Sequence, residues 1–209
     1  MNPSAADQPE IDHPGADHPG VTPPDTARLG VLRRYREDLA ANNGERFRPG
    51  LIAIHVARFG RWRMGIRPKP LRVPFSLLYR VLYNFVHFFA SIHLPYSVTI
   101  GRRFTLEHSG GITIHGAVVI GDDCIVRQCC TLGIRRMERL HDAPVLGNGV
   151  IVGAGAKVLG RVHLGDGCQI GANAVVLDDV PAGAIAAGVP ARVVGRVREG
   201  GGAEQREMK

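Results

Sequence analysis

The spacing of apolar residues changes near residue 100. From there onward aliphatic residues recur at every sixth position, a period that neither a 3.6-residue helix nor an alternating strand produces. The longest unbroken series consists of Leu146, Val152, Val158, Leu164, Ile170 and Val176. The period predicts a parallel β-helix of six-residue rungs, in which each aliphatic side chain points into a narrow prism and stacked coils bury one another's faces.

The six-residue period is interrupted twice. It slips by two residues between Leu106 and Ile114, and by two again between Leu132 and Leu146. The second interruption leaves residues 134–144 outside the prism. A long polar loop on a rigid scaffold is where binding and catalytic residues are often found, so we expect this loop to contribute to a site.

The region before the repeats has helical periodicity. Helices are predicted over residues 27–42, 49–64 and 74–92, and Pro49 suits a first helical turn. The third helix has a wide apolar face that needs a partner. We favour packing against the next domain or a neighbouring subunit over peripheral contact with a membrane.

Composition divides the chain further. Residues 1–27 are acidic and proline-rich, with too little apolar surface to offset the entropy of ordering, so we expect a disordered tail. Residues 28–93 form the helical N-terminal region, residues 94–196 the β-helix domain, and residues 197–209 a flexible C-terminal tail. The expected fold class is therefore mainly β.

Charge and composition narrow the classes of function. The net charge is +7, and because residues 1–27 hold five acidic residues and no Lys or Arg, the remainder carries +12. Such a field favours an anionic partner, although the aromatic residues lie away from the basic ones, which argues against nucleic acid. The sequence lacks a run of about eighteen apolar residues, a secretory signal pattern and paired CxxC cysteines. We therefore expect a reduced, cytoplasmic protein.

Several short motifs stand out in this background. They are IAIHVARFGRW (52–62), LEHSGG (106–111), TLG (131–133), GAGAKVLG (153–160) and AAGVPAR (186–192). Over about residues 50–196 these motifs resemble the hexapeptide-repeat acyltransferases, and specifically the serine acetyltransferases. The resemblance implies left-handed β-helices assembled as a homotrimer or a dimer of trimers. It also implies acetyl-CoA as co-substrate, bound in the groove between neighbouring prisms, and no metal.

The resemblance assigns five positions to acetyl-CoA. Ala154 and Ala172 fall where small side chains let the pantetheine arm approach the backbone. Gly188 and Arg192 belong to a C-terminal loop beside the cofactor, where an arginine can also meet a phosphate. Gly133 belongs to the TLG motif.

The same resemblance suggests catalytic roles. His108 matches the family's general base, which takes the proton from an acceptor hydroxyl as that oxygen attacks the thioester carbonyl. Histidine suits this task because its unperturbed pKa lies close to neutral pH. Glu107 stands where serine acetyltransferases carry Asp, and we expect it to orient His108 or to bind the acceptor. His141 is expected to substitute in part for a second histidine of the family.

Departures from the family motif favour a sugar hydroxyl over free serine as the acceptor. The family's orienting Asp, fifteen residues before the base, is His93 here. A gap-free alignment of the loop places Asp142 at the arginine that pairs with the acceptor carboxylate, and Ala143 at the second histidine. Because two carboxylates repel each other, we expect a sugar or polysaccharide precursor, bound with help from the loop arginines.

Other functions stay open. One is a true serine O-acetyltransferase of cysteine biosynthesis, another a metal-dependent hydratase with ligands such as His115 and His163, and a third a non-catalytic β-helix protein. No cysteine synthase complex is expected, because the sequence does not end in the isoleucine through which serine acetyltransferases dock. A cysteine nucleophile is disfavoured, because most of the cysteines fall at inward positions and no base is evident beside Cys129.

Overall fold

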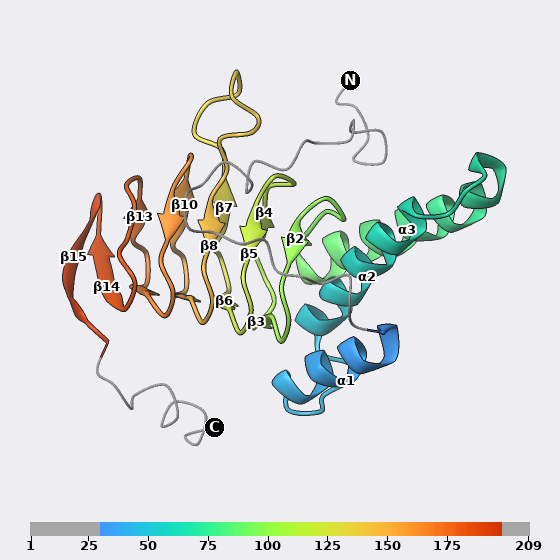
Figure 1. Cartoon of the computed structure of the whole chain (residues 1–209), viewed down its shortest axis with the longest axis horizontal. Helices are drawn as coiled ribbons and strands as arrows, with labels where there is room; N and C mark the ends of the chain where they lie inside the picture. The colour runs from blue at the N-terminus through green and yellow to red at the C-terminus, as the bar shows by residue number, and fades with distance from the viewer. Residues whose placement is uncertain (1–29, 198–209) are drawn as a thin grey trace.

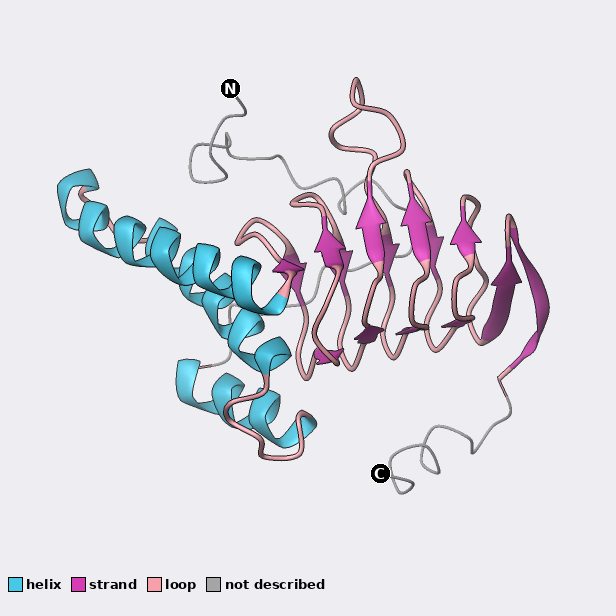
Figure 2. Cartoon of the chain, turned by 180° about the vertical axis from the view of Figure 1, so that it is seen from behind, coloured by secondary structure: helices cyan, strands magenta, loops and turns pink. Residues whose placement is uncertain are grey.

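The computed structural model describes residues 30–197. Figures 1 and 2 show a prism of stacked coils with three helices at one end. The helices are α1 (Val31–Ala41), α2 (Pro49–Met64) and α3 (Lys69–Ala90). The tail expected over residues 1–27 lies outside the described residues, and so does the C-terminal tail apart from residue 197.

Three sheets form the faces of the prism. Sheet A contains β1 (Ile92–His93), β4 (Ile112–Ile114), β7 (Thr131–Gly133), β10 (Lys157–Leu159) and β13 (Val175–Val176). Sheet B contains β2 (Thr99–Ile100), β5 (Val119–Ile120), β8 (Val145–Leu146) and β11 (His163–Leu164). Sheet C contains β3 (Thr105–Glu107), β6 (Ile125–Arg127), β9 (Ile151–Val152), β12 (Gln169–Ile170), β14 (Ala184–Gly188) and β15 (Ala191–Arg196). All pairs are parallel except β14 with β15, and the predicted parallel β-helix is confirmed.

The interior of the prism is built from the six-residue series. Its later members, from Leu146 to Val176, are all at most 3% exposed. Cys124, Cys130 and Cys168 occupy inward positions as predicted, and burial raises the pKa of the Cys124 and Cys168 thiols to about 12. These thiols therefore act as small core side chains.

Coil length explains both slips of the period. A regular coil has 18 residues, as the pairing of Lys157 with Val175 shows. The first coil has 20, and its additional residues lie in the turn 108–111 between β3 and β4. The coil that contains the loop 134–144 has 26, since Val119 pairs with Val145. Both insertions leave the register of the sheets intact.

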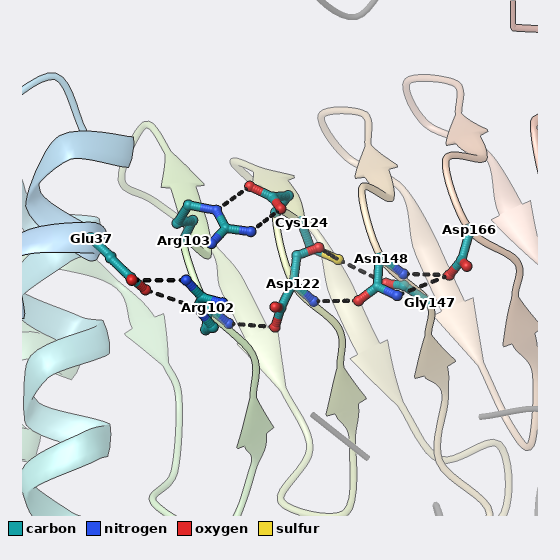
Figure 3. Close-up of polar contacts among 9 residues, drawn as sticks. Glu37, Arg102, Arg103, Asp122, Cys124, Gly147, Asn148 and Asp166 are labelled. Carbon is teal, nitrogen blue, oxygen red and sulfur yellow. Dashed lines mark hydrogen bonds and ion pairs between the residues drawn. The ribbon is translucent and has the colours of Figure 1, made fainter. Parts of the chain in front are cut away.

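One corner of the prism carries a ladder of side-chain contacts (Figure 3). The backbone N–H of Arg102 donates to Oδ1 of Asp122 at 2.8 Å, and the N–H of Asp122 donates to Oδ1 of Asn148 at 2.9 Å. The N–H of Asn148 in turn donates to Oδ1 of Asp166 at 2.6 Å. Each corner side chain thus satisfies an amide of the preceding coil, which would otherwise lack a partner.

The helices are attached at the start of this ladder. Glu37 of α1 accepts two hydrogen bonds from the Arg102 guanidinium, each 2.8 Å long (Figure 3). Arg58 of α2 donates to the buried Asp38 at 3.0 Å and to the carbonyl oxygen of Gly101 at 2.8 Å. These charge-assisted bonds fix α1 and α2 against the first coil.

Helix α3 begins earlier than the sequence predicts. It starts at Lys69, with Pro74 inside it, and ends at Ala90 instead of extending to residue 92. A proline removes one backbone donor from the helix interior, but contacts with α2 hold this part of the chain helical. The ring of Phe75 packs edge-on against Trp62, with centroids 5.6 Å apart. Helix α2 has the predicted bounds.

Gly121 tests the packing of the ladder corner. A Cβ atom at this position would overlap the carbonyl oxygen of Gly147 in the next coil. We expect Gly121→Ala to destabilise the protein by about 1–3 kcal/mol, seen as a thermal midpoint lower by several degrees. Gly195→Ala is the matched control, because no atom of the part of the chain that the structure describes lies within 4 Å of its added carbon. Equal midpoints for the two variants would contradict this packing.

Candidate active site

His108 lies in the turn between sheets C and A that holds the two additional residues of the first coil. Its φ is +63°, in the left-handed region that non-glycine residues rarely adopt. The turn stays in the stack because the N–H of Gly110 donates to Ala90 at 3.0 Å, and the N–H of Cys129 donates to Gly110 at 2.8 Å. The side chain of His108 is exposed. The insertion thus displays an imidazole at an edge of the prism.

Sheet C places the turn that holds His108 at one end of a column of residues predicted to bind acetyl-CoA. Glu107 pairs with Arg127, but the turn 108–111 that follows Glu107 is two residues longer than the turn that follows Arg127. Gly110 is therefore the equivalent of Gln128, because the N–H of Cys129 donates to Gly110 just as the N–H of Gly155 donates to Gln128. The later pairs of sheet C extend the same column in register. This corner column consists of Gly110, Gln128, Ala154, Ala172 and Gly188, and His108 lies two residues before its first member.

Backbone hydrogen bonds hold the coils of the corner column together. The N–H of Gly155 donates to the carbonyl of Gln128 at 2.9 Å, and that of Asn173 donates to Ala154 at 2.8 Å. Neighbouring coils lie about 4.8 Å apart, so the column is roughly 19 Å long. Only methyl groups or hydrogens project from its last three members. An extended ligand can therefore approach the backbone over this length.

Glu107 is a buried carboxylate and not a solvated corner residue. It is 5% exposed, and Arg127 of the next coil donates to it from Nε at 2.9 Å. Its observed partner is therefore an arginine. The predicted role of Glu107 in orienting His108 or binding an acceptor stays a prediction.

His141 lies in the exposed loop 134–144, which leaves sheet A after β7. The turn that holds His108 enters sheet A before β4. Because β4 and β7 are parallel, the two histidines of one chain lie at opposite ends of the strands of this sheet. His141 instead lies near His115, whose pKa is lowered mainly by burial and further by the charge of His141. Gly133, the last residue of β7, is buried at the same edge as the loop.

Arg192 lies close to the end of the corner column. It pairs with Ala187, the neighbour of Gly188, across the antiparallel strands β14 and β15. Its guanidinium is exposed and makes an ion pair with the exposed Asp178 at 3.4 Å. Exposed pairs of this kind are weak, so the side chain is available to an anionic ligand.

The hydrogen-bond partner that the structure shows for His93 is Tyr83. His93 lies in β1, paired with Thr113, and its Nδ1 is 2.8 Å from the Tyr83 hydroxyl. The residue beside the His108 turn is Ser91, whose carbonyl accepts from Ile112 at 3.1 Å. Sequence reasoning missed Ser91, because only its left-handed φ of +52°, at the end of α3, places it there.

The histidines considered as metal ligands are not gathered into a site. Within residues 30–197, no three His, Cys, Asp or Glu side chains are grouped so that they could hold a metal ion. The hydratase alternative therefore gains no support from the geometry.

The fold and the six-residue period define a hexapeptide-repeat transferase. The family described as bacterial transferase hexapeptide (six repeats) matches residues 143–178. A serine acetyltransferase of Helicobacter pylori strain J99 is 40% identical over 124 residues, which cover 59% of this chain and 72% of the relative. A serine acetyltransferase of Mycobacterium tuberculosis is 35% identical over 150 residues, which cover 71% and 62%.

Solved structures agree with these relatives. A serine acetyltransferase in complex with coenzyme A from Brucella abortus strain S19 has a TM-score of 0.70 and 26% identity, covering 80% of this chain and 68% of that one. A serine acetyltransferase in complex with cysteine has a TM-score of 0.67 and 30% identity, covering 78% and 69%. The chain therefore belongs to the serine acetyltransferase family of hexapeptide-repeat acyltransferases. It spans less than two thirds of the length of the Mycobacterium tuberculosis relative.

These relatives overturn the expected sugar acceptor. The expectation rested on a gap-free alignment of the loop 134–144, and it was wrong. This loop lies outside the prism, where no coil register fixes which residue faces a ligand. Asp142 also forms an ion pair with Arg139 at 3.5 Å, and the arginine offsets the negative charge that would repel an acceptor carboxylate.

Three partly buried histidines predict a dependence of stability on pH. Burial lowers the pKa of His55, His93 and His115 below the ordinary value of 6.5. The histidines of the unfolded chain therefore bind protons at a higher pH than those of the folded protein. The free energy of unfolding has its full value above about pH 7 and decreases as the pH drops through 6.5. We expect a lower urea midpoint at pH 5.5 than at pH 7.5.

The histidine variants provide the control for this measurement. His93→Asn should make the drop between the two pH values smaller, because one partly buried imidazole is lost. His108→Asn should leave the drop as it is in the parent, since that side chain is exposed. A parent protein with the same midpoint at both pH values would refute the prediction.

Proposed function

We propose that this protein is a serine O-acetyltransferase, which transfers the acetyl group of acetyl-CoA to the hydroxyl of L-serine. The products are O-acetylserine and coenzyme A. The observation that carries the proposal is the identity of 40% with a relative of that name, over 72% of the relative's length. The corner column supplies a geometry in which the transfer can take place.

The corner column fits a thioester carried on a long, flexible arm. Ala154, Ala172 and Gly188 leave the backbone of three coils accessible to such an arm. Arg192 lies beside the last of them and can donate to a phosphate group. Acetyl-CoA supplies an activated acetyl group, and a serine acetyltransferase of known structure binds coenzyme A.

His108 performs the proton transfers in this proposal. Its imidazole accepts the proton of the serine hydroxyl while the serine Oγ forms a bond to the thioester carbonyl carbon. It then returns the proton to the sulfur atom as the carbon–sulfur bond breaks. Both steps take place at one end of the corner column, where the arm would present its reactive end.

The acceptor is proposed to be a free amino acid held by the loop 134–144. A serine acetyltransferase has been solved with cysteine, which differs from serine only in having sulfur in place of oxygen. The loop offers the exposed Arg135 and Arg136 to an amino-acid carboxylate. The loop and His108 of one chain lie at opposite ends of the strands of sheet A. The loop that completes the site beside His108 would therefore come from a neighbouring subunit of a homotrimer.

Replacing His108 tests the proposed base. We expect His108→Ala to lower kcat with L-serine by about 10²- to 10⁴-fold, because proton transfer would lose its catalyst, while the KM for acetyl-CoA changes little. The measurement is thiol release from acetyl-CoA. His163→Ala, on sheet B, is the matched control and should retain activity. Unchanged turnover in His108→Ala, or sugars used faster than serine by the parent, would refute the proposal.

Ala172 tests the proposed course of the cofactor arm. Ala172→Leu would fill the corner column with a larger side chain, and we expect coenzyme A to bind at least about tenfold more weakly, a loss of about 1.4 kcal/mol. Isothermal titration calorimetry with coenzyme A measures the effect. Ala182→Leu adds the same atoms at an exposed site between sheets B and C. Equal affinity in both variants would exclude this course.

A further inference from the structure

Helix α3 presents a long apolar face to solvent. Only three of its residues, Tyr79, Tyr83 and Val86, are buried. Its exposed large apolar residues are Leu71, Val73, Leu77, Leu78, Val81, Leu82, Phe85, Phe88 and Phe89. Phe88 is 79% exposed and Phe89 70%. A continuous apolar face of this size marks an interaction surface, and Figures 1 and 2 show α3 extending away from the prism.

The surroundings of this face are strongly basic. From Pro49 to Ala90 the sequence contains seven Lys or Arg residues, and no Asp or Glu stands anywhere between Glu45 and Glu107. An isologous contact between two copies of this face would bring like charges together, with no carboxylate from this region to compensate them. The charge instead complements an anionic partner. The sequence alone favoured a protein partner for this helix, whereas the charge around the exposed face favours an anionic one.

A cavity of about 360 Å³ lies at one flank of the apolar face, between α2 and α3. Four basic side chains line it, together with the hydroxyl of Ser76 and three apolar side chains. The basic residues are Arg63, Lys69, Arg72 and Arg80, and the apolar ones are Met64, Val73 and Leu77. Val73 and Leu77 also belong to the exposed face of α3, so the cationic cavity and the apolar face form one continuous surface.

Arg63 is a buried cation in the wall of this cavity, and aromatic rings hold its guanidinium in place. It is only 2% exposed, and its guanidinium lies 4.4 Å from the ring centroid of Tyr79 and 4.8 Å from that of Tyr96. Its Nη1 donates to Ser76 at 2.7 Å, whereas Nε and Nη2 have no hydrogen-bond partner among residues 30–197. A buried cation without a carboxylate is costly unless an anion approaches it.

We propose that α3 lies in the surface of an anionic phospholipid bilayer, with its apolar face among the acyl chains and a headgroup phosphate in the cationic cavity. An amphipathic helix with Phe and Leu on one face and Lys and Arg at its margin is typical of this location. No helix within residues 30–197 is long and apolar enough to cross a membrane. The protein would therefore lie on the bilayer, independently of the reaction that it catalyses.

Vesicle co-sedimentation of the full chain tests this proposal. We expect binding to vesicles of phosphatidylcholine with phosphatidylglycerol, little binding to phosphatidylcholine alone, and weaker binding in 0.5 M KCl. Arg72→Gln with Arg80→Gln should weaken partitioning roughly 25-fold, since each charge near an anionic surface contributes about a fivefold factor. Phe88→Ser with Phe89→Ser should weaken it at least about tenfold, because burial of the two rings is lost.

Matched variants control for charge and hydrophobicity elsewhere. Arg135→Gln with Arg136→Gln and Met137→Ser with Leu140→Ser change the exposed loop 134–144 in the same ways, and both should bind like the parent. Circular dichroism verifies the fold of each variant. Absence of binding to anionic vesicles, or binding insensitive to both α3 pairs, overturns the proposal. A lower molar mass in Phe88→Ser with Phe89→Ser, without vesicle binding by the parent, would assign the face to contacts between copies and also overturn it.

Discussion

The register of backbone hydrogen bonds between successive coils is the constraint on which the rest of the molecule depends. Strands of two or three residues have no stability of their own, so each coil exists only because the coils beside it pair with its amides and carbonyls. The same register places equivalent residues above one another. At one corner it aligns Asp122, Asn148 and Asp166 to satisfy neighbouring amides, and at another it aligns Gly110, in the turn that holds His108, with Ala154.

The candidate chemistry arises where this regularity is broken. The additional residues of the turn 108–111 display an imidazole at the edge of the prism, and the loop 134–144 displays arginines. Neither insertion disturbs the pairing of the strands around it. A rigid repeat can therefore carry two irregular segments, and differences among related proteins in what they bind can be confined to those segments.

The sequence was sufficient to predict the prism, because a six-residue period fixes the inward positions of its coils. It was insufficient where contacts between different elements determine the partner of a side chain or the start of a helix. The partner of Glu107 is an arginine one coil away, and the start of α3 depends on the contact of Phe75 with Trp62. The loop 134–144 has no period, so aligning Asp142 by counting residues gave the wrong acceptor. The cationic cavity requires α2 and α3 to be placed together, which no single segment reveals.

Strand β15 has a consequence for how copies of this chain can meet. The terminal coils of such a stack have strands with unpaired N–H and C=O groups. If these strands were exposed, another molecule could pair with them end to end and extend the stack into a filament. Here β15 turns back antiparallel along β14 and occupies that rim of sheet C. At the opposite rim α2 packs against β3, with Gly50 lying directly on Leu106. With these two rims occupied, association is directed to the flanks of the prism, where the corner column lies.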